Sequence, residues 1–128
     1  MQKIVLNIFD QHAPVVDALK TRLELEDSLA IQYAGPFKPN MSVEGETAVI
    51  TLLGLSGGSQ VNPKQTEQMV AQLTAQGTAV IILSPYIKET ERELALAAGA
   101  RRYLLKTINA GELIAQITAV YQEIQQEM

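Results

Sequence analysis

The chain has 128 residues and a mass of 14.0 kDa, of which 47% are hydrophobic and 19% charged. This length suits one domain with a buried core, and the composition excludes a largely disordered chain. The absence of Cys excludes disulfides, thiol nucleophiles and Cys-ligated zinc, and a single His leaves no multi-histidine metal site. The net charge of −4 disfavours direct binding of nucleic acid by this domain.

The first apolar run, residues 4–9, is too short for the core of a signal peptide. The runs at 48–53 and 79–83 also fall far short of the roughly 20 residues that cross a bilayer. We therefore expect a cytoplasmic protein with no membrane partner.

Buried strands are predicted in chain order by near-continuous apolar runs at 4–9, 29–33, 48–53, 79–83 and 103–105. Helical spacing follows most of these runs, at 15–23, 69–73, 87–98 and, most clearly, 113–128. The segment 36–46 contains Pro36, Pro39 and Gly45, so the helix expected between the second and third strands should be short or irregular.

Start and stop signals support these helices. Asn62 and Pro63 predict the start of one helix, and Gly77 and Gly99 predict the ends of two. Asn109 is a predicted N-cap of the last helix, with Glu112 three residues later.

Strands that alternate with helices predict an α/β domain, in which an open parallel sheet has helices on both faces. In such sheets ligands bind beyond the carboxyl ends of the strands. The residues of interest are therefore those that follow strands: 10–12, 54–59, 84–86 and 106–107.

The C-terminal third carries a family resemblance. Segments 79–84, 97–106 and 112–113 are similar in residue type and spacing to the receiver domains of two-component response regulators, and the resemblance extends over essentially the whole chain. Asp10-Gln11-His12 also fits, although the family usually has two adjacent acids there. The resemblance implies one receiver-like domain, 1–128, with the flavodoxin-like (CheY-like) fold and five parallel strands in the order 2-1-3-4-5.

The chemistry of the family is phosphoryl transfer from a partner His to an Asp at the end of the third strand, assisted by Mg²⁺. The resemblance implies that Lys106 is the pocket lysine, Ser84 the hydroxyl and Tyr103 the aromatic switch. The acceptor position is Gly54, which has no side chain to phosphorylate. No Asp or Glu lies between Glu46 and Glu67, so shifting the alignment by one residue restores no acceptor.

The metal-binding pattern is also incomplete, because Gln11 and Gly54 stand where the family has acids and leave Asp10 alone. We expect Mg²⁺ binding to be weak or absent and no other cofactor. We predict that Lys106 pairs with Asp10 in place of the lost acceptor, while Pro85 crowds the pocket. Asp10 also fits a simple helix cap, and that interpretation stays open.

The resemblance further implies a partner-binding surface on the fourth helix, fifth strand and fifth helix of the family pattern, used for a protein partner or for a homodimer. Its candidate residues here are Lys88, Glu91, Arg101, Arg102, Glu112 and Gln116. The same charges also fit an ordinary solvated face.

Two enzyme or cofactor patterns compete. The pattern G-x-S-x-G at 54–58 fits a hydrolase nucleophile elbow, but the only His precedes the Ser and the next helix signal comes late. Asp10 and His12 fit the D-x-H pattern of cobalamin-binding modules, but Val15 stands where that motif has Gly. The glycine-rich loop 54–59 also offers backbone amides to an anion.

The favoured interpretation is a pseudo-receiver: a signalling module that acts by protein–protein interaction without phosphorylation and is not an enzyme. The alternative is the receiver domain of a longer transcriptional regulator.

Overall fold

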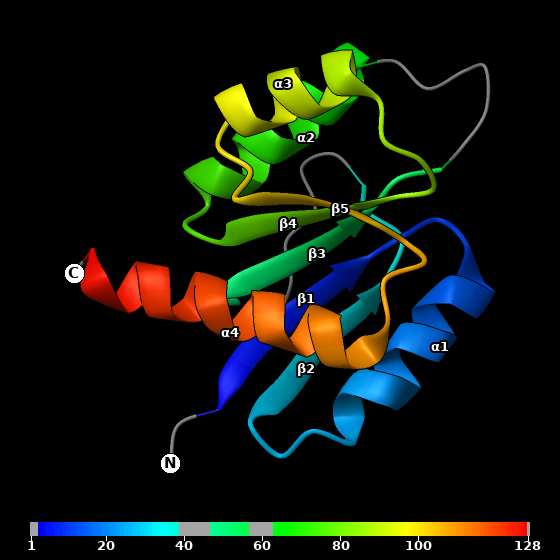
Figure 1. Cartoon of the computed structure of the whole chain (residues 1–128), viewed down its shortest axis with the longest axis vertical. Coiled ribbons are helices and arrows are strands. Elements are labelled where there is room, and N and C mark those ends of the chain that lie inside the picture. Colours follow the sequence, from blue (N-terminus) through cyan, green and yellow to red (C-terminus); the bar gives the residue numbers. More distant parts are fainter. Residues whose placement is uncertain (1–2, 39–46, 57–62, 128) are drawn as a thin grey trace.

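The computed structural model describes residues 3–38, 47–56 and 63–127, which form a five-stranded sheet and four helices (Figure 1). The elements in chain order are β1 (Ile4–Phe9), α1 (Ala13–Glu24), β2 (Leu29–Gly35), β3 (Ile50–Gly54), α2 (Pro63–Ala75), β4 (Ala79–Ser84), α3 (Glu89–Ala97), β5 (Arg102–Leu105) and α4 (Ala110–Gln126). The strands are parallel throughout and lie in the order β2-β1-β3-β4-β5. The predicted fold class and strand order are confirmed.

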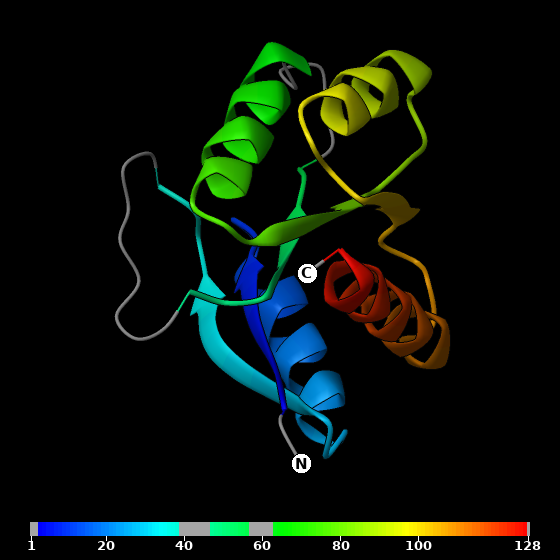
Figure 2. The ribbon, with the colours of Figure 1, turned by 90° about the vertical axis from the view of Figure 1, so that its left-hand side faces the viewer.

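The helices cover the two faces of the sheet in pairs. Figure 2 shows α2 and α3 on one side and α1 and α4 on the other. Each pair closes its own core: one unites Leu23 of α1 and Ile117 of α4 with the sheet, and the other unites Leu73 of α2 and Ala95 of α3 with the opposite sheet face. Both faces of the central strands are therefore buried, which explains their continuous apolar runs.

The predicted helix boundaries are confirmed where their signals are strongest. Gly77 follows α2 with φ +94° and Gly99 follows α3 with φ +119°, a left-handed conformation that side chains rarely adopt. Asn109 caps α4, because its side chain accepts the backbone N–H of Glu112 at 2.8 Å.

The connection between β2 and β3 contains no helix at 36–38 or 47–49. The short or irregular helix expected there would fall on 39–46, outside the described residues. Phe37 is buried instead and packs edge-on against Phe9 of β1, with ring centroids 5.2 Å apart. An aromatic side chain thus fills part of the core beside the strand that ends at the candidate site.

Among the described residues, no helix has the length and apolar character needed to cross a lipid bilayer.

Candidate functional site

Four residues meet at the carboxyl edge of the sheet because the strand registers align their ends. Phe9 pairs with Leu53, Gly54 with Leu83, and Ser84 with Leu105. Asp10, Gly54, Ser84 and Lys106 therefore lie at the ends of four neighbouring strands. The backbone N–H of Lys106 also donates to the carbonyl of Ser84 at 2.7 Å, which fixes the start of the segment after β5.

Asp10 is buried and holds both of its carboxylate oxygens in defined contacts. Its Oδ2 lies 2.8 Å from the Nζ of Lys106, and the predicted ion pair is confirmed. Its Oδ1 accepts the backbone N–H of His12 at 2.9 Å. His12 is the N-cap residue of α1, and its own side chain makes no cap hydrogen bond. The Asp10 side chain thus stabilises the turn before α1 and pairs with Lys106 at the same time.

Gly54 lies directly against the Asp10 carboxyl group. A Cβ built at position 54 would lie 3.1 Å from the Cβ of Asp10 and 2.7 Å from its Cγ, and closer still to Oδ2. Atoms do not approach this closely without displacement, so position 54 accepts no side chain while Asp10 keeps its place. Asp10 thus occupies the volume from which a side chain at position 54 would extend. No pattern in the sequence indicates this steric coupling.

Gln11 contributes its amide elsewhere. Its Nε2 donates to the carbonyl of Phe37 at 3.0 Å, so the side chain ties the end of β1 to the segment after β2. Asp10 remains the acid of the predicted pocket, and it is already paired with a lysine.

This donor set does not fit the Mg²⁺ that the resemblance to receiver domains implies. A hard dication takes several oxygen ligands in near-octahedral geometry. In the described part of the chain, no group of three or more His, Cys, Asp or Glu side chains is placed to hold a metal ion. Lys106 already neutralises the carboxylate of Asp10, and no step is assigned to a metal.

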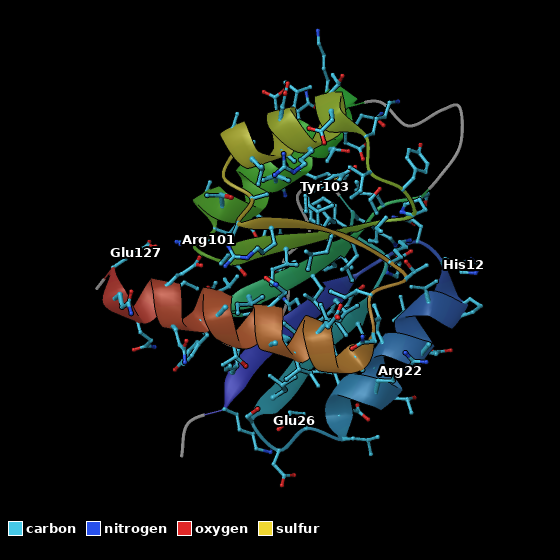
Figure 3. The ribbon with its side chains drawn as sticks, viewed as in Figure 1. His12, Arg22, Glu26, Arg101, Tyr103 and Glu127 are labelled. Atoms are coloured by element: carbon cyan, nitrogen blue, oxygen red, sulfur yellow. The ribbon has the colours of Figure 1, made fainter. Side chains whose placement is uncertain are left out.

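A second buried cluster joins β4, β5 and α3. The Oγ of Ser84 donates to the carbonyl of Tyr86 at 2.7 Å. The Tyr103 hydroxyl donates to Oε1 of Glu91 at 2.6 Å and lies 3.3 Å from the Oγ of Ser84. In Figure 3, Tyr103 lies between β5 and α3. Burial raises the pKa of the Tyr103 phenol, the hydrogen bond to Glu91 raises it further, and the Ser84 contact opposes the rise.

The placement of Glu91 on an exposed partner surface is wrong. Glu91 is 1% exposed, and its carboxylate accepts a hydrogen bond from the Tyr103 hydroxyl. The physical reason is the helix period: Glu91 lies one turn before the buried Ala95, on the face of α3 that packs on the sheet. The alternating acids at 89, 91 and 93 obscure this spacing, whereas the step of four between positions 91 and 95 would have indicated it.

The other predicted surface residues lie on α3, β5 and α4 or beside them. Lys88 and Glu112 are exposed, while Arg101, Arg102 and Gln116 are half-buried. Arg102 binds residues of α4, and Arg101 binds Glu127, the C-cap residue of that helix, labelled in Figure 3. The contacts are Arg101 with Glu127 at 2.7 Å, Arg102 with Gln116 at 2.9 Å, and Arg102 with Glu123.

These pairs shift the pKa values of the acids. The hydrogen bond from Arg102 lowers the pKa of Glu123, and that from Arg101 lowers the pKa of Glu127. Neither glutamate was predicted from the sequence as a partner of the arginines. Their steps of three and four along the terminal helix were the available signal.

An open groove of about 480 Å³ lies beside β5 and the start of α4. It is lined by Ile87, Tyr103, Leu105, Ile108 and Glu112, among others. Ile87 and Leu105 are 47% and 39% exposed, so this face combines internally paired charges with uncovered apolar side chains.

The competing motifs gain no support from the described geometry. Ser56 is exposed, and the next described helix begins only at Pro63. Residues 57–59 of the glycine-rich loop lie outside the described residues, so its proposed anion cradle stays a prediction. His12 is exposed and points away from the sheet edge (Figure 3).

Comparison with known proteins gives relatives by structure alone: no family model matches the chain, and no curated protein matches its sequence. The signal receiver domain of NarL from Mycobacterium tuberculosis superposes with a TM-score of 0.76 at 17% identity, over 95% of this chain and 98% of that one. A CheY-like receiver domain protein from Methanospirillum hungatei gives 0.71 at 18% identity, over 100% of both chains. A response regulator from Thermotoga maritima gives 0.73 at 16% identity, over 94% and 98%. The chain therefore has the receiver fold of response regulators.

Proposed function

We propose that this chain is a pseudo-receiver: a cytoplasmic signalling module of a two-component-type system that binds a protein partner, accepts no phosphoryl group and is not an enzyme. The observation that carries the proposal is the position of Asp10. Its carboxyl group lies against Gly54, where an acceptor side chain would begin, and it pairs with Lys106.

Phosphoryl transfer to Asp10 itself is disfavoured by its surroundings. A carboxylate nucleophile needs an accessible oxygen and cations that stabilise the transferred charge. The Asp10 side chain is 1% exposed and both of its oxygens are engaged, one by Lys106 and one by the backbone of His12. A response regulator from Burkholderia pseudomallei, 18% identical and with a TM-score of 0.70, is described with a phosphorylated aspartic acid and a calcium ion. Its phosphorylation is a property of that protein, and position 54 of this chain has no carboxylate.

We place the partner-binding surface on α3, β5 and α4. This placement is supported by the exposed apolar side chains of Ile87 and Leu105. The charged residues Lys88 and Glu112 are exposed on the same elements or beside them. Arg101 and Arg102 already bind acids of α4 and its C-cap, so they are less available for contacts with a second chain. A protein partner of another kind is favoured over a homodimer held by these arginines.

Incubation with acetyl phosphate and Mg²⁺, followed by intact-mass measurement, tests the proposal. We expect no gain of a phosphoryl group by the wild-type chain under conditions that phosphorylate a receiver with an acceptor Asp, treated in parallel. The Asp10→Asn variant should behave as the wild type. A stable phosphoryl group on an aspartate of the wild-type chain would contradict the proposal.

A further inference from the structure

We propose that Glu91 is an internal anchor that holds the ring of Tyr103 in its buried position and so fixes the α3–β5–α4 surface without a phosphoryl group. The inference deepens the proposed function and rests on it for the role of that surface. It concerns a positioning residue, because Glu91 acts through Tyr103.

The first observation is the hydrogen-bond geometry of the Tyr103 hydroxyl. Its distance to Oε1 of Glu91 is 2.6 Å, against 3.3 Å to Ser84 Oγ and 3.4 Å to the carbonyl of Tyr86. A hydroxyl that donates to a carboxylate makes a short and comparatively strong bond. Glu91 is therefore the dominant partner of the phenol.

The second observation is the free-energy cost of burying the Glu91 carboxylate. The residue is 1% exposed, and its Oε2 has no hydrogen-bond partner among the described residues. A buried carboxylate that lacks a paired cation is unfavourable. Its position in the first turn of α3 offsets part of this cost, since the positive end of the helix dipole favours an acid there. The remaining cost is explained if the carboxylate serves to hold Tyr103.

The third observation connects this bond to the surface. Tyr103 lines the open groove together with Ile87 and Leu105. The ring also packs in the core between the sheet and the α2–α3 layer, and Tyr103 is only 7% exposed. Because Tyr103 belongs to both the core and the groove wall, displacement of its ring would change the shape of that wall. The Glu91 bond thus fixes one wall of the groove.

The experiment observes the Tyr103 ring directly by NMR of protein labelled with ring-¹³C tyrosine. The chain has four tyrosines, and Tyr103→Phe assigns the resonance. Glu91→Leu preserves approximate volume and removes the acceptor. Glu91→Gln preserves a neutral acceptor. Glu93→Gln, at an exposed position of the same helix, is the matched control.

We expect the Tyr103 ring to resist a soluble paramagnetic probe in the wild type, in Glu91→Gln and in Glu93→Gln. In Glu91→Leu the protection should fall several-fold and the resonance should move or broaden. Equal protection and an unchanged resonance in Glu91→Leu would overturn the proposal.

If circular dichroism shows that Glu91→Leu does not fold, the Tyr103 resonance of Glu91→Gln tests the proposal instead. Loss of the charged acceptor should shift the Cζ resonance of Tyr103, whereas Glu93→Gln should not. An unchanged Cζ resonance in Glu91→Gln would overturn the proposal. These measurements use no phosphoryl donor, so their failure is distinct from failure of the proposed function in the acetyl phosphate assay.

Discussion

In the described part of the chain, two carboxylates are buried near one edge of the sheet and are stabilised by different means. Asp10 has a lysine ammonium at 2.8 Å and a backbone N–H at 2.9 Å. Glu91 has the Tyr103 hydroxyl at 2.6 Å and a second oxygen without a partner among the described residues. The charge of Asp10 is thus compensated by a cation, whereas that of Glu91 is held by one hydrogen bond and a helix end.

This difference indicates which region resists change. Separation of Asp10 from Lys106 leaves a buried charge without its cation, so the pocket has one strongly favoured arrangement. If Glu91 separates from Tyr103, the Tyr103 hydroxyl still has the Oγ of Ser84 and the carbonyl of Tyr86 within 3.4 Å. We therefore expect the pocket to be rigid and the Tyr103 region to be the more adaptable one.

The largest effect is expected from Lys106→Met. The substitution retains much of the apolar stem but leaves the carboxylate of Asp10 unpaired, which should lower the free energy of unfolding by about 3 kcal/mol. Urea denaturation measures the loss. Lys88→Met, at an exposed position, should change stability by less than about 0.5 kcal/mol. Equal effects of the two substitutions would show that the Asp10 pair does not stabilise the fold.

The next effect is expected from Gly54→Ala. The new Cβ meets the carboxyl group of Asp10, and the displacement should cost about 1–3 kcal/mol. The same substitution in an Asp10→Ala background should cost less, with an interaction energy above about 0.5 kcal/mol in a double-mutant cycle. Additive losses would refute the steric coupling between the two positions.

A smaller effect is expected at alkaline pH. The pKa of Tyr103 is raised above 10.0 in the folded chain, chiefly by burial and then by the Glu91 bond. The folded state therefore retains the phenol proton after the unfolded state begins to lose it, and stability should fall as pH rises through the folded pKa. Urea unfolding between about pH 8 and pH 11 measures this loss, which Tyr103→Phe should reduce. A pH dependence that persists unchanged in Tyr103→Phe would assign the loss to other groups.

The smallest effect is expected at acid pH and comes from α4. Because Arg102 lowers the pKa of Glu123 below 4.5, its stabilisation is present above that pH and is lost as pH falls through the folded pKa. Arg102→Gln should return the pKa of Glu123 towards its usual value, measured by carboxyl ¹³C NMR. The contribution to stability should be slight, since exposed ion pairs stabilise folds weakly. An unchanged Glu123 titration in Arg102→Gln would show that the pair does not persist in solution.

Much of the fold was predictable because its signals are local. Gly77, Gly99 and Asn109 mark helix ends through backbone conformation and capping, which depend little on the rest of the chain. The Asp10–Lys106 pair was also predictable, because the carboxyl ends of parallel strands meet at one edge.

The remaining features depend on how elements are rotated and how side chains are oriented. The burial of Glu91 follows from the face that α3 turns towards β5, which a run of alternating acids does not reveal. The contact of Asp10 with Gly54 follows from a side-chain rotamer at a strand end. The partners of Arg101 and Arg102 lie up to 26 residues later, on α4 or at its C-cap, so their identity required the packed helix.

The close contact between Asp10 and Gly54 also constrains how this sequence can evolve. An acidic residue introduced at position 54 by one mutation would arrive in a space that the Asp10 carboxyl group already fills. The variant would bear a steric penalty and, if both acids were ionised, a repulsion between like charges. The gain of a carboxylate at position 54 therefore requires Asp10 to change or move first. Each such first step weakens the pair with Lys106, so selection for stability alone disfavours it.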